Sequence, residues 1–107
     1  MNEEHSPDHT RKHILEGLRV VFRLTPQETN LMMLLYTMQL VTPEVIVQRL
    51  GIATEVRVAM YRLRRTLVRH GVVINSKRRF GYWLDNETKA QIKEKLAREY
   101  VHEEEVA

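Results

Sequence analysis

The chain has 107 residues, 43% of them hydrophobic and 29% charged, which is the composition of one globular domain and excludes a fibrous or wholly disordered protein. It contains no cysteine, so disulfide bonds, thiolate zinc sites and cysteine catalysis are excluded and a reducing cytoplasm is expected. The longest apolar run, residues 31–36, is far shorter than the roughly 20 residues of a membrane span, and the acidic N-terminus is unlike a secretory signal. We therefore expect a cytoplasmic protein with no membrane partner.

The formal net charge of +3 conceals a basic middle between two acidic flanks. Residues 49–79 contain nine Lys or Arg and a single acid, Glu55, whereas residues 1–48 and 80–107 each contain more acids than bases. This distribution is typical of a surface that binds a polyanion. The alternative is the solvated face of a helix, but such faces normally mix both signs.

The first 24 residues give weak signals. Residues 1–12 are polar and lack periodicity, so they are predicted to be a disordered tail. Residues 13–16 favour a short helical turn that ends at Gly17. The β-branched and aromatic residues of 20–24 then favour a short strand or an extended lead-in.

The strongest helix signal begins at Thr25. Thr25, Pro26 and Glu28 form a capping box with proline at the first helical position. A core stripe at i, i+3, i+4, i+7 spacing follows: Leu31, Leu34, Leu35 and Met38. Met32 and Met33 make the helix apolar on nearly every side, so it is either the buried centre of the domain or meets a partner. Its methionines could line a ligand pocket, but methionine more often fills gaps in a core.

Two further helices are predicted before a change of pattern. Thr42 with Pro43 opens a short helix, and Gly51 ends it in the left-handed conformation that glycine favours. Thr54 then caps a third helix over residues 55–70. Its inward seam has helical spacing: Val56, Met60, Leu63 and Leu67.

After this helix the apolar pattern changes to period two. Residues 72–74 and 81–84 predict two strands, joined by the basic residues 75–79, so the segment is a β-hairpin with a cationic tip. A last helix is predicted from residue 85 to about residue 101. Its narrow apolar stripe consists of Ile92, Leu96 and Tyr100. Such a stripe favours a dimerisation helix, with packing on its own domain as the alternative.

A helix that ends at Gly51, a short turn and a new helix form the pattern of a helix-turn-helix, whose second helix docks in the DNA major groove. A helical projection of residues 55–70 places arginine and one tyrosine along the outward arc: Arg57, Tyr61, Arg62, Arg64, Arg65 and Arg69. The planar guanidinium can grip two phosphate oxygens or the O6/N7 edge of guanine. This pattern of arginines therefore predicts that the outward side of the helix binds DNA.

Residues 56–67, followed by residues 74–82, resemble the DNA-binding domain of OmpR/PhoB-type response regulators. That family typically has Leu-Arg in its recognition helix and a hairpin that ends in Arg-Gly-x-Gly-Tyr. Residues 24–28 (Leu-Thr-Pro-Gln-Glu) also resemble the Leu-Thr-x-x-Glu start of the family's first helix. The resemblance covers about residues 22–84.

The resemblance implies a winged helix in which residues 55–70 enter the major groove and the wing, residues 75–81, enters the minor groove through Arg78. Arg79 replaces the first glycine after the wing arginine, so a different tip geometry is expected. Contact with the transcription machinery is also implied, although residues 51–54 are shorter than the family loop that contacts RNA polymerase. The predicted DNA contacts are Arg57, Val58, Tyr61, Arg62, Arg64, Arg65, Arg69, Lys77, Arg78 and Arg79.

Other site chemistry has little support in the sequence. His5, His9 and His13 have the i, i+4 spacing of a helical metal pair, but no further ligand accompanies them, so a solvated tail is favoured and no metal or other cofactor is predicted. His70 is expected to complement the helix dipole. No Gly-rich phosphate loop, Ser/His/Asp arrangement or ordered carboxylate pair is recognisable, so we do not expect an enzyme.

The predicted fold is mainly α with a small β-hairpin, a winged helix-turn-helix over residues 13–84, with a C-terminal helix and acidic tail over residues 85–107. The predicted function is sequence-specific binding of double-stranded DNA by a bacterial or phage transcriptional regulator, associated with the nucleoid and possessing a homodimer contact through the C-terminal helix. One alternative is an architectural or DNA-packaging adaptor with low sequence specificity. Another is a winged helix that binds an acidic protein partner.

Overall fold

Five α-helices and one β-hairpin make up the described part of the chain, residues 7–52 and 55–100 of the computed structural model. The elements are α1 (Pro7–Phe22), α2 (Pro26–Thr37), α3 (Pro43–Leu50), α4 (Val56–Leu67), a 3-10 turn (Val68–His70), β1 (Asn75–Lys77), β2 (Gly81–Trp83) and α5 (Asn86–Glu99). The prediction of a mainly helical fold with a small hairpin is confirmed. No helix among these residues is long and apolar enough to cross a membrane.

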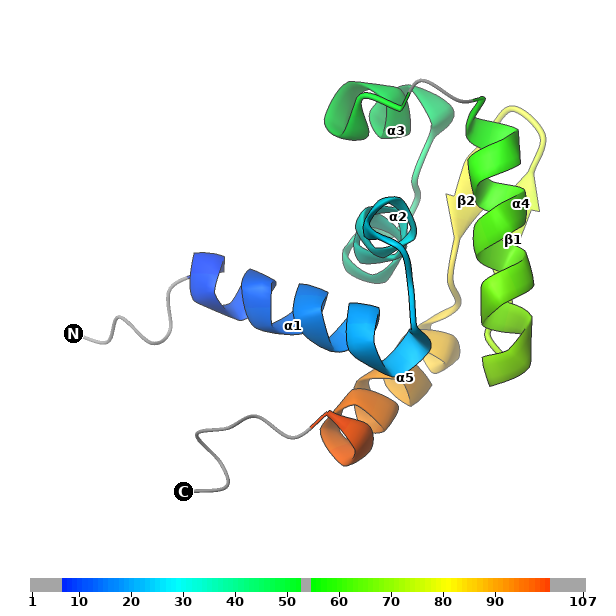
Figure 1. The fold of residues 1–107 in the computed structure, drawn as a ribbon. Helices are drawn as coiled ribbons and strands as arrows, with labels where there is room; N and C mark the ends of the chain where they lie inside the picture. The colour runs from blue at the N-terminus through cyan, green and yellow to red at the C-terminus, as the bar shows by residue number, and fades with distance from the viewer. Residues whose placement is uncertain (1–6, 53–54, 101–107) are drawn as a thin grey trace.

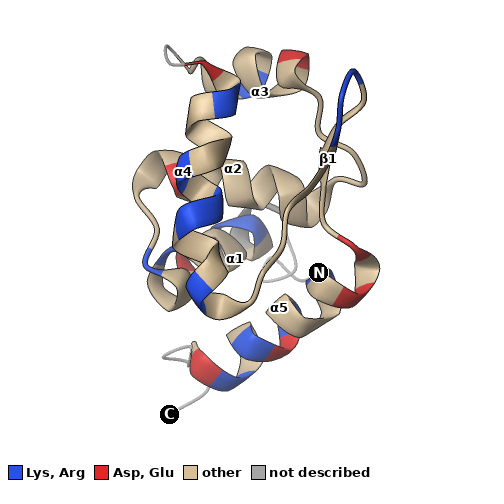
Figure 2. Cartoon of the chain, turned by 90° about the vertical axis from the view of Figure 1, so that its right-hand side faces the viewer, with Lys and Arg blue, Asp and Glu red and all other residues tan. Residues whose placement is uncertain are grey.

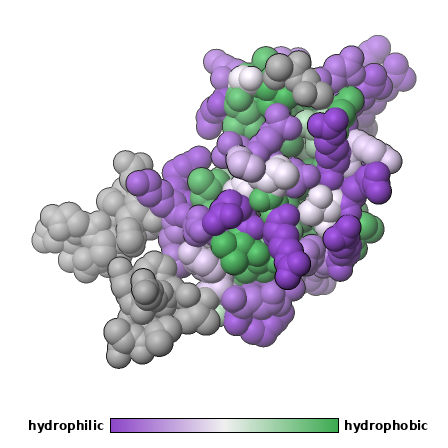
Figure 3. Space-filling model, viewed as in Figure 1, coloured by the Kyte–Doolittle hydropathy of each residue, from purple (hydrophilic) through white to green (hydrophobic). Residues whose placement is uncertain are grey.

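Helix α2 is the centre of the fold, and helices α1, α3 and α4 all contact it (Figure 1). Its residues 31–35 are all buried, which confirms the interpretation of an apolar helix surrounded by the rest of the domain. The completely buried side chains of the other helices face it: Leu18 and Phe22 from α1, Ile46 from α3, Leu63 and Leu67 from α4. Figure 3 shows hydrophilic residues over much of one face of the molecule, with hydrophobic residues in separate patches between them.

Helix α1 corrects the prediction for the first 24 residues. It runs without a break from Pro7 to Phe22, through residues 7–12, where a disordered tail was expected, and through Gly17, where a helix end was expected. The helix ends at Arg23, which has a φ of 56°, and the Leu24 N–H donates to the Arg19 carbonyl at 3.0 Å. The strand or lead-in predicted over residues 20–24 is therefore wrong. Residues 1–6 lie outside the described residues.

Gly17 is needed for packing and not for ending a helix. A Cβ atom at this position would lie 3.1 Å from Cδ2 of Tyr100 and 3.3 Å from Cδ2 of Leu96, because α5 packs against α1 here. The Tyr100 ring also lies 5.3 Å from the ring of His13, centroid to centroid. The glycine thus marks the crossing of two helices that are about 80 residues apart in the sequence.

The apolar stripe of α5 packs against other parts of the same chain. Ile92 is 1% exposed, Leu96 and Tyr100 are partly buried, and the Lys89 ammonium donates to the carbonyl oxygen of Met38 at 2.9 Å. Leu96 and Tyr100 lie against Gly17 of α1, so the alternative, packing of this helix on its own domain, accounts for these two residues. The homodimer contact through this helix stays a prediction.

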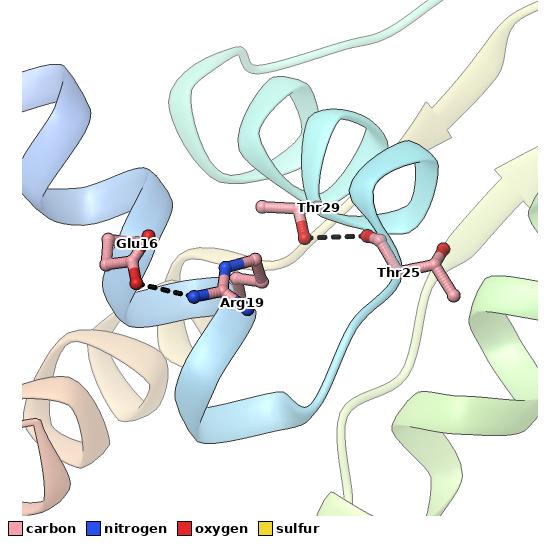
Figure 4. A network of polar contacts seen from close by, with 4 residues as sticks. All are labelled: Glu16, Arg19, Thr25 and Thr29. Atoms are coloured by element: carbon pink, nitrogen blue, oxygen red, sulfur yellow. Dashed lines mark hydrogen bonds and ion pairs between the residues drawn. The ribbon is translucent and has the colours of Figure 1, made fainter.

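The capping signals predicted the helix starts correctly at α2 and α3. At α2 the Glu28 N–H donates to Thr25 Oγ1 at 3.2 Å, and the Thr25 N–H donates to Glu28 Oε1 at 3.0 Å. The buried Thr29 hydroxyl donates to the Thr25 carbonyl at 2.7 Å, as Figure 4 shows beside the Glu16–Arg19 ion pair of α1. At α3 the Val45 N–H donates to Thr42 Oγ1 at 3.2 Å.

The end of α3 also follows the sequence signal, whereas the start of α4 does so only in part. Gly51 takes the predicted left-handed conformation, with a φ of 58°. Thr54, the predicted cap of the third helix, lies outside the described residues. The residue before α4 is Glu55, whose side chain makes no capping hydrogen bond.

The hairpin is displaced from its predicted position. β1 begins at Asn75 and pairs with β2 so that Ser76 lies opposite Tyr82, whereas residues 72–74 were expected to form the first strand. Residues 75–77, predicted as part of the tip, are therefore strand residues. The connection between α2 and α3 adds to the hairpin: Val41 N donates to the Tyr82 carbonyl at 2.8 Å, and Tyr82 N donates to the Val41 carbonyl at 2.9 Å.

This pairing requires a glycine beside Tyr82. Gly81 has a φ of 136°, and a Cβ atom there would lie 2.5 Å from the carbonyl oxygen of Val41. No side chain fits at such a distance, so Gly81 allows the hairpin to approach the α2–α3 connection. The hairpin is thereby held at a defined position beside α4.

Candidate nucleic-acid interface

The side of α4 that faces the core is the side that the sequence predicted. Met60, Leu63 and Leu67 are at most 1% exposed and face the core. The opposite side carries exposed residues, which include most of the predicted contacts: Arg57, Val58, Tyr61, Arg62 and Arg65, with Arg69 on the following 3-10 turn. Figure 2 shows Lys and Arg along this helix and at the tip of the hairpin, both turned toward the viewer. The arginines of residues 57–69 and the cations of the tip, which are 8 or more positions apart in the sequence, thus lie on one side of the molecule.

The positive charge of this face is largely uncompensated. Arg57 lies 4.0 Å from Glu55 Oε1, and both side chains are highly exposed, so this ion pair is weak. Among the described residues, Arg62, Arg65 and Arg69 have no carboxylate within ion-pair distance. Uncompensated guanidinium groups in a row create a positive potential that attracts a polyanion.

Arg64 differs from the other arginines of α4. Its Nη2 atom donates to the Ile74 carbonyl at 2.8 Å and to Ser76 Oγ at 3.0 Å, and its guanidinium lies 5.9 Å from the centre of the Tyr82 ring. The side chain is partly buried and joins α4 to both strands. The helical projection placed Arg64 on the outward arc, whereas the structure has its side chain directed to the hairpin.

The helical projection missed this role because it considers only one helix. Arg64 is near the border between the inward and outward sides of α4, and the residues that cover it come from the hairpin. The partner atoms are 10 and 12 residues further along the chain, and one of them is a backbone carbonyl. No residue pattern within α4 could have indicated them.

The tip of the hairpin is a tight turn that displays its cations. The Phe80 N–H donates to the Lys77 carbonyl at 2.9 Å, with Arg78 and Arg79 between them. Arg79 has a φ of 72°, so this arginine takes the left-handed conformation that a glycine would adopt more easily. Arg78 and Arg79 therefore lie in the turn and not along a strand.

Phe80 is a residue of this tip that the sequence analysis did not select. Its side chain is 56% exposed, and the Lys77 ammonium lies 4.8 Å from the centre of its ring. The signal was available in the sequence as a large aromatic residue next to three cations. Tyr82, two residues later, packs partly against the core.

A groove joins the tip to α4. It has a volume of about 470 Å³ and lies between the start of α3, the start of α4 and the hairpin. Its charged lining residues are Glu44, Arg57, Lys77, Arg78 and Arg79. With four cations and one acid, the groove extends the basic surface of α4 to the hairpin. We call this combined surface the basic face, defined by the exposed α4 residues above, Arg69 and residues 77–80.

His70 lies at the edge of the basic face, at the end of the 3-10 turn. Burial lowers the pKa of its imidazole, and the nearby Lys95 ammonium lowers this pKa further. The ring packs edge-on against Phe22, with ring centres 4.9 Å apart. His70 therefore belongs to the contact between α1, α4 and α5. Among the described side chains there is no cluster of three His, Asp or Glu that could hold a metal ion.

Comparison of the chain with protein-family models, with curated proteins and with solved structures finds no match. The resemblance to OmpR/PhoB-type domains therefore depends on the sequence motifs alone and stays a prediction.

Proposed function

We propose that the chain is a sequence-specific double-stranded DNA-binding protein, a bacterial or phage transcriptional regulator that associates with the nucleoid. The observation that carries this proposal is the continuity of the basic face, where exposed arginines of α4 and the cationic hairpin tip lie on one side of the molecule. The element order also supports it. The elements follow the order of a winged helix-turn-helix: helix α2, the extended residue Val41, helices α3 and α4, and a hairpin that pairs with Val41.

In this proposal α4 lies in the major groove. Arg62 donates to a guanine edge, Val58 contacts a thymine methyl group and Tyr61 contacts a base or phosphate. Arg57, Arg65 and Arg69 bind phosphates and set the register of the helix on the duplex. Arg64 contacts no DNA and instead holds the hairpin against α4.

The hairpin is the wing of this proposal and lies against the minor groove. Arg78 enters a narrow A·T-rich segment, where the negative potential is strongest, and Lys77 and Arg79 bind phosphates. Removing a phosphate contact weakens binding to every sequence and lowers the salt slope by about 0.9. Removing Arg78 reduces instead the preference for A·T at the flank of the site.

Selection from a random duplex library, followed by binding to the enriched site at several salt concentrations, tests the proposal. We expect one enriched sequence and a strong salt dependence. Arg98→Gln is the matched control for Arg62→Gln, because Arg98 is an exposed arginine of α5 outside the basic face. Salt-dependent binding without an enriched sequence would instead indicate an architectural or packaging adaptor. Absence of salt-dependent DNA binding would refute the proposal and favour an acidic protein partner.

A further inference from the structure

A second hollow lies on a part of the molecule that shares no residue with the basic face. Its volume is about 360 Å³, and it lies between α1, α2 and α3. Figure 1 shows α1 and α3 extending to the same side of α2. The lining residues are Arg11, Lys12, Leu15, Asn30, Met33, Leu34, Arg49 and Leu50.

The hollow is lined mainly by two kinds of residue, apolar side chains and cations. Met33 and Leu34 are 2% and 4% exposed, so only small parts of these core side chains reach the surface of the hollow. Leu15 and Leu50 add further apolar surface and pack against the same core. Asn30 is the single uncharged polar residue. The interior therefore offers contact to an apolar group of limited length.

The charged residues of the lining are all cations. Arg11 and Lys12 come from α1 and Arg49 comes from the end of α3, so they converge from two helices. All three are exposed, and none has a carboxylate of the described residues within ion-pair distance. No Asp or Glu lines the hollow. An anion placed here would gain charge-assisted hydrogen bonds from these three cations.

We propose that this hollow binds a small amphipathic monocarboxylate. The apolar chain lies over Met33 and Leu34, and the carboxylate lies between Arg49 and the pair Arg11 and Lys12. The volume is near the lower end of the range of about 300–1,000 Å³ that is typical of small-ligand sites, which suits a short chain. An amphipathic helix of a partner protein would need apolar contacts over several turns, and this hollow provides only four apolar residues.

Such a ligand would contact three helices at once and should stabilise the folded state. It would also touch Leu50, which directly precedes the turn at Gly51 that leads toward α4. The binding site itself does not depend on the proposed DNA binding. Failure of either proposal can therefore be recognised separately.

The test is titration of the full chain with octanoate, followed by amide chemical shifts in two-dimensional NMR spectra and by thermal unfolding. We expect saturable shifts confined to residues 11–15, 30–34 and 49–50, and a higher unfolding midpoint. The neutral analogue octan-1-ol and the cationic octylammonium should bind at least about tenfold more weakly, because each lacks a charge-assisted bond to the rim cations.

Two matched double variants localise the site. Arg11→Gln with Arg49→Gln should weaken octanoate binding by about tenfold or more, whereas Arg57→Gln with Arg98→Gln removes two exposed arginines elsewhere and should not change it. Equal binding of octanol, shifts centred on the basic face, or no saturation would overturn the proposal. It would also be overturned if octanoate left these amides unchanged while an acidic amphipathic peptide shifted them.

Discussion

Helices α4 and α5 are both rich in cations, but they use them differently. On α5 three of the four cations have partners: Lys95 lies 2.8 Å from Glu99, Arg98 lies 3.8 Å from the same carboxylate, and Lys89 donates to the Met38 carbonyl just after α2. On α4 only Arg57 has a nearby acid, and Arg64 alone is engaged with the rest of the fold. Mixed charge is sufficient for a solvated helix. A row of arginines without neighbouring carboxylates, as on α4, is expected when the anions that neutralise them belong to a partner molecule.

The largest expected effect is a loss of stability that occurs on substitution of the buried side of α4 and not of its exposed side. Leu63→Ala should lower the free energy of unfolding by about 2–5 kcal/mol, because Leu63 is fully buried against α2 and the neighbouring core cannot fill the space. Chemical denaturation measures this loss. Val58→Ala, on the exposed side of the same helix, is the control and should change stability by less than about 0.5 kcal/mol. Similar losses for both variants would contradict the observed phase of α4.

The next largest effect is a difference between the two arginines beside Leu63, one of which should affect stability and the other DNA binding. Arg64→Ala removes hydrogen bonds to the hairpin and should cost about 1–3 kcal/mol of folding free energy. Arg62→Ala should leave the stability unchanged but weaken binding to the selected DNA site by about 1–3 kcal/mol. Thermal melts and binding isotherms of both variants provide the comparison. If Arg62→Ala destabilises the fold as much as Arg64→Ala, the division between scaffold and contact residues is wrong.

A smaller effect concerns the tip of the hairpin. Arg79→Gly and Arg79→Ala both remove the same charge, but only glycine adopts the φ of 72° without steric cost. We expect the glycine variant to be more stable than the alanine variant by about 1 kcal/mol, while both lose DNA affinity equally. Equal stability of the two variants would show that the turn changes its conformation when the side chain is shortened.

The smallest effect is a pH dependence at His70, at the end of the 3-10 turn. The folded state lowers the pKa of His70, through burial first and Lys95 second, so protonation favours the unfolded chain. The stabilisation is fully present above the unfolded pKa of about 6.5 and decreases as the pH falls from there toward the folded pKa. Unfolding free energies measured at about pH 7.5 and about pH 5 should show a smaller difference in His70→Gln than in the unchanged chain. The charged groups that act on this imidazole, Lys95, Glu99, Arg69 and Arg23, remain in both proteins and serve as the internal reference.

The sequence by itself determined those features whose causes lie within a few residues. The capping boxes and caps at Thr25 and Thr42, and the end of α3 at Gly51, depend on hydrogen bonds or backbone conformations over at most four positions. The phase of α4 follows from a seam of apolar residues with helical spacing. The concentration of arginine in the middle of the chain is likewise a property of the sequence alone.

Tertiary structure decided the features whose causes lie far apart in the chain. Gly17 lies inside helix α1 and against Leu96 and Tyr100, and the hairpin begins at Asn75 in a sheet register that Val41 and Gly81 share. Arg64 turned inward because a backbone carbonyl and a hydroxyl of the hairpin compete with solvent for its guanidinium. In each case the deciding partner is ten or more residues away, and its position exists only after the helices have packed around α2.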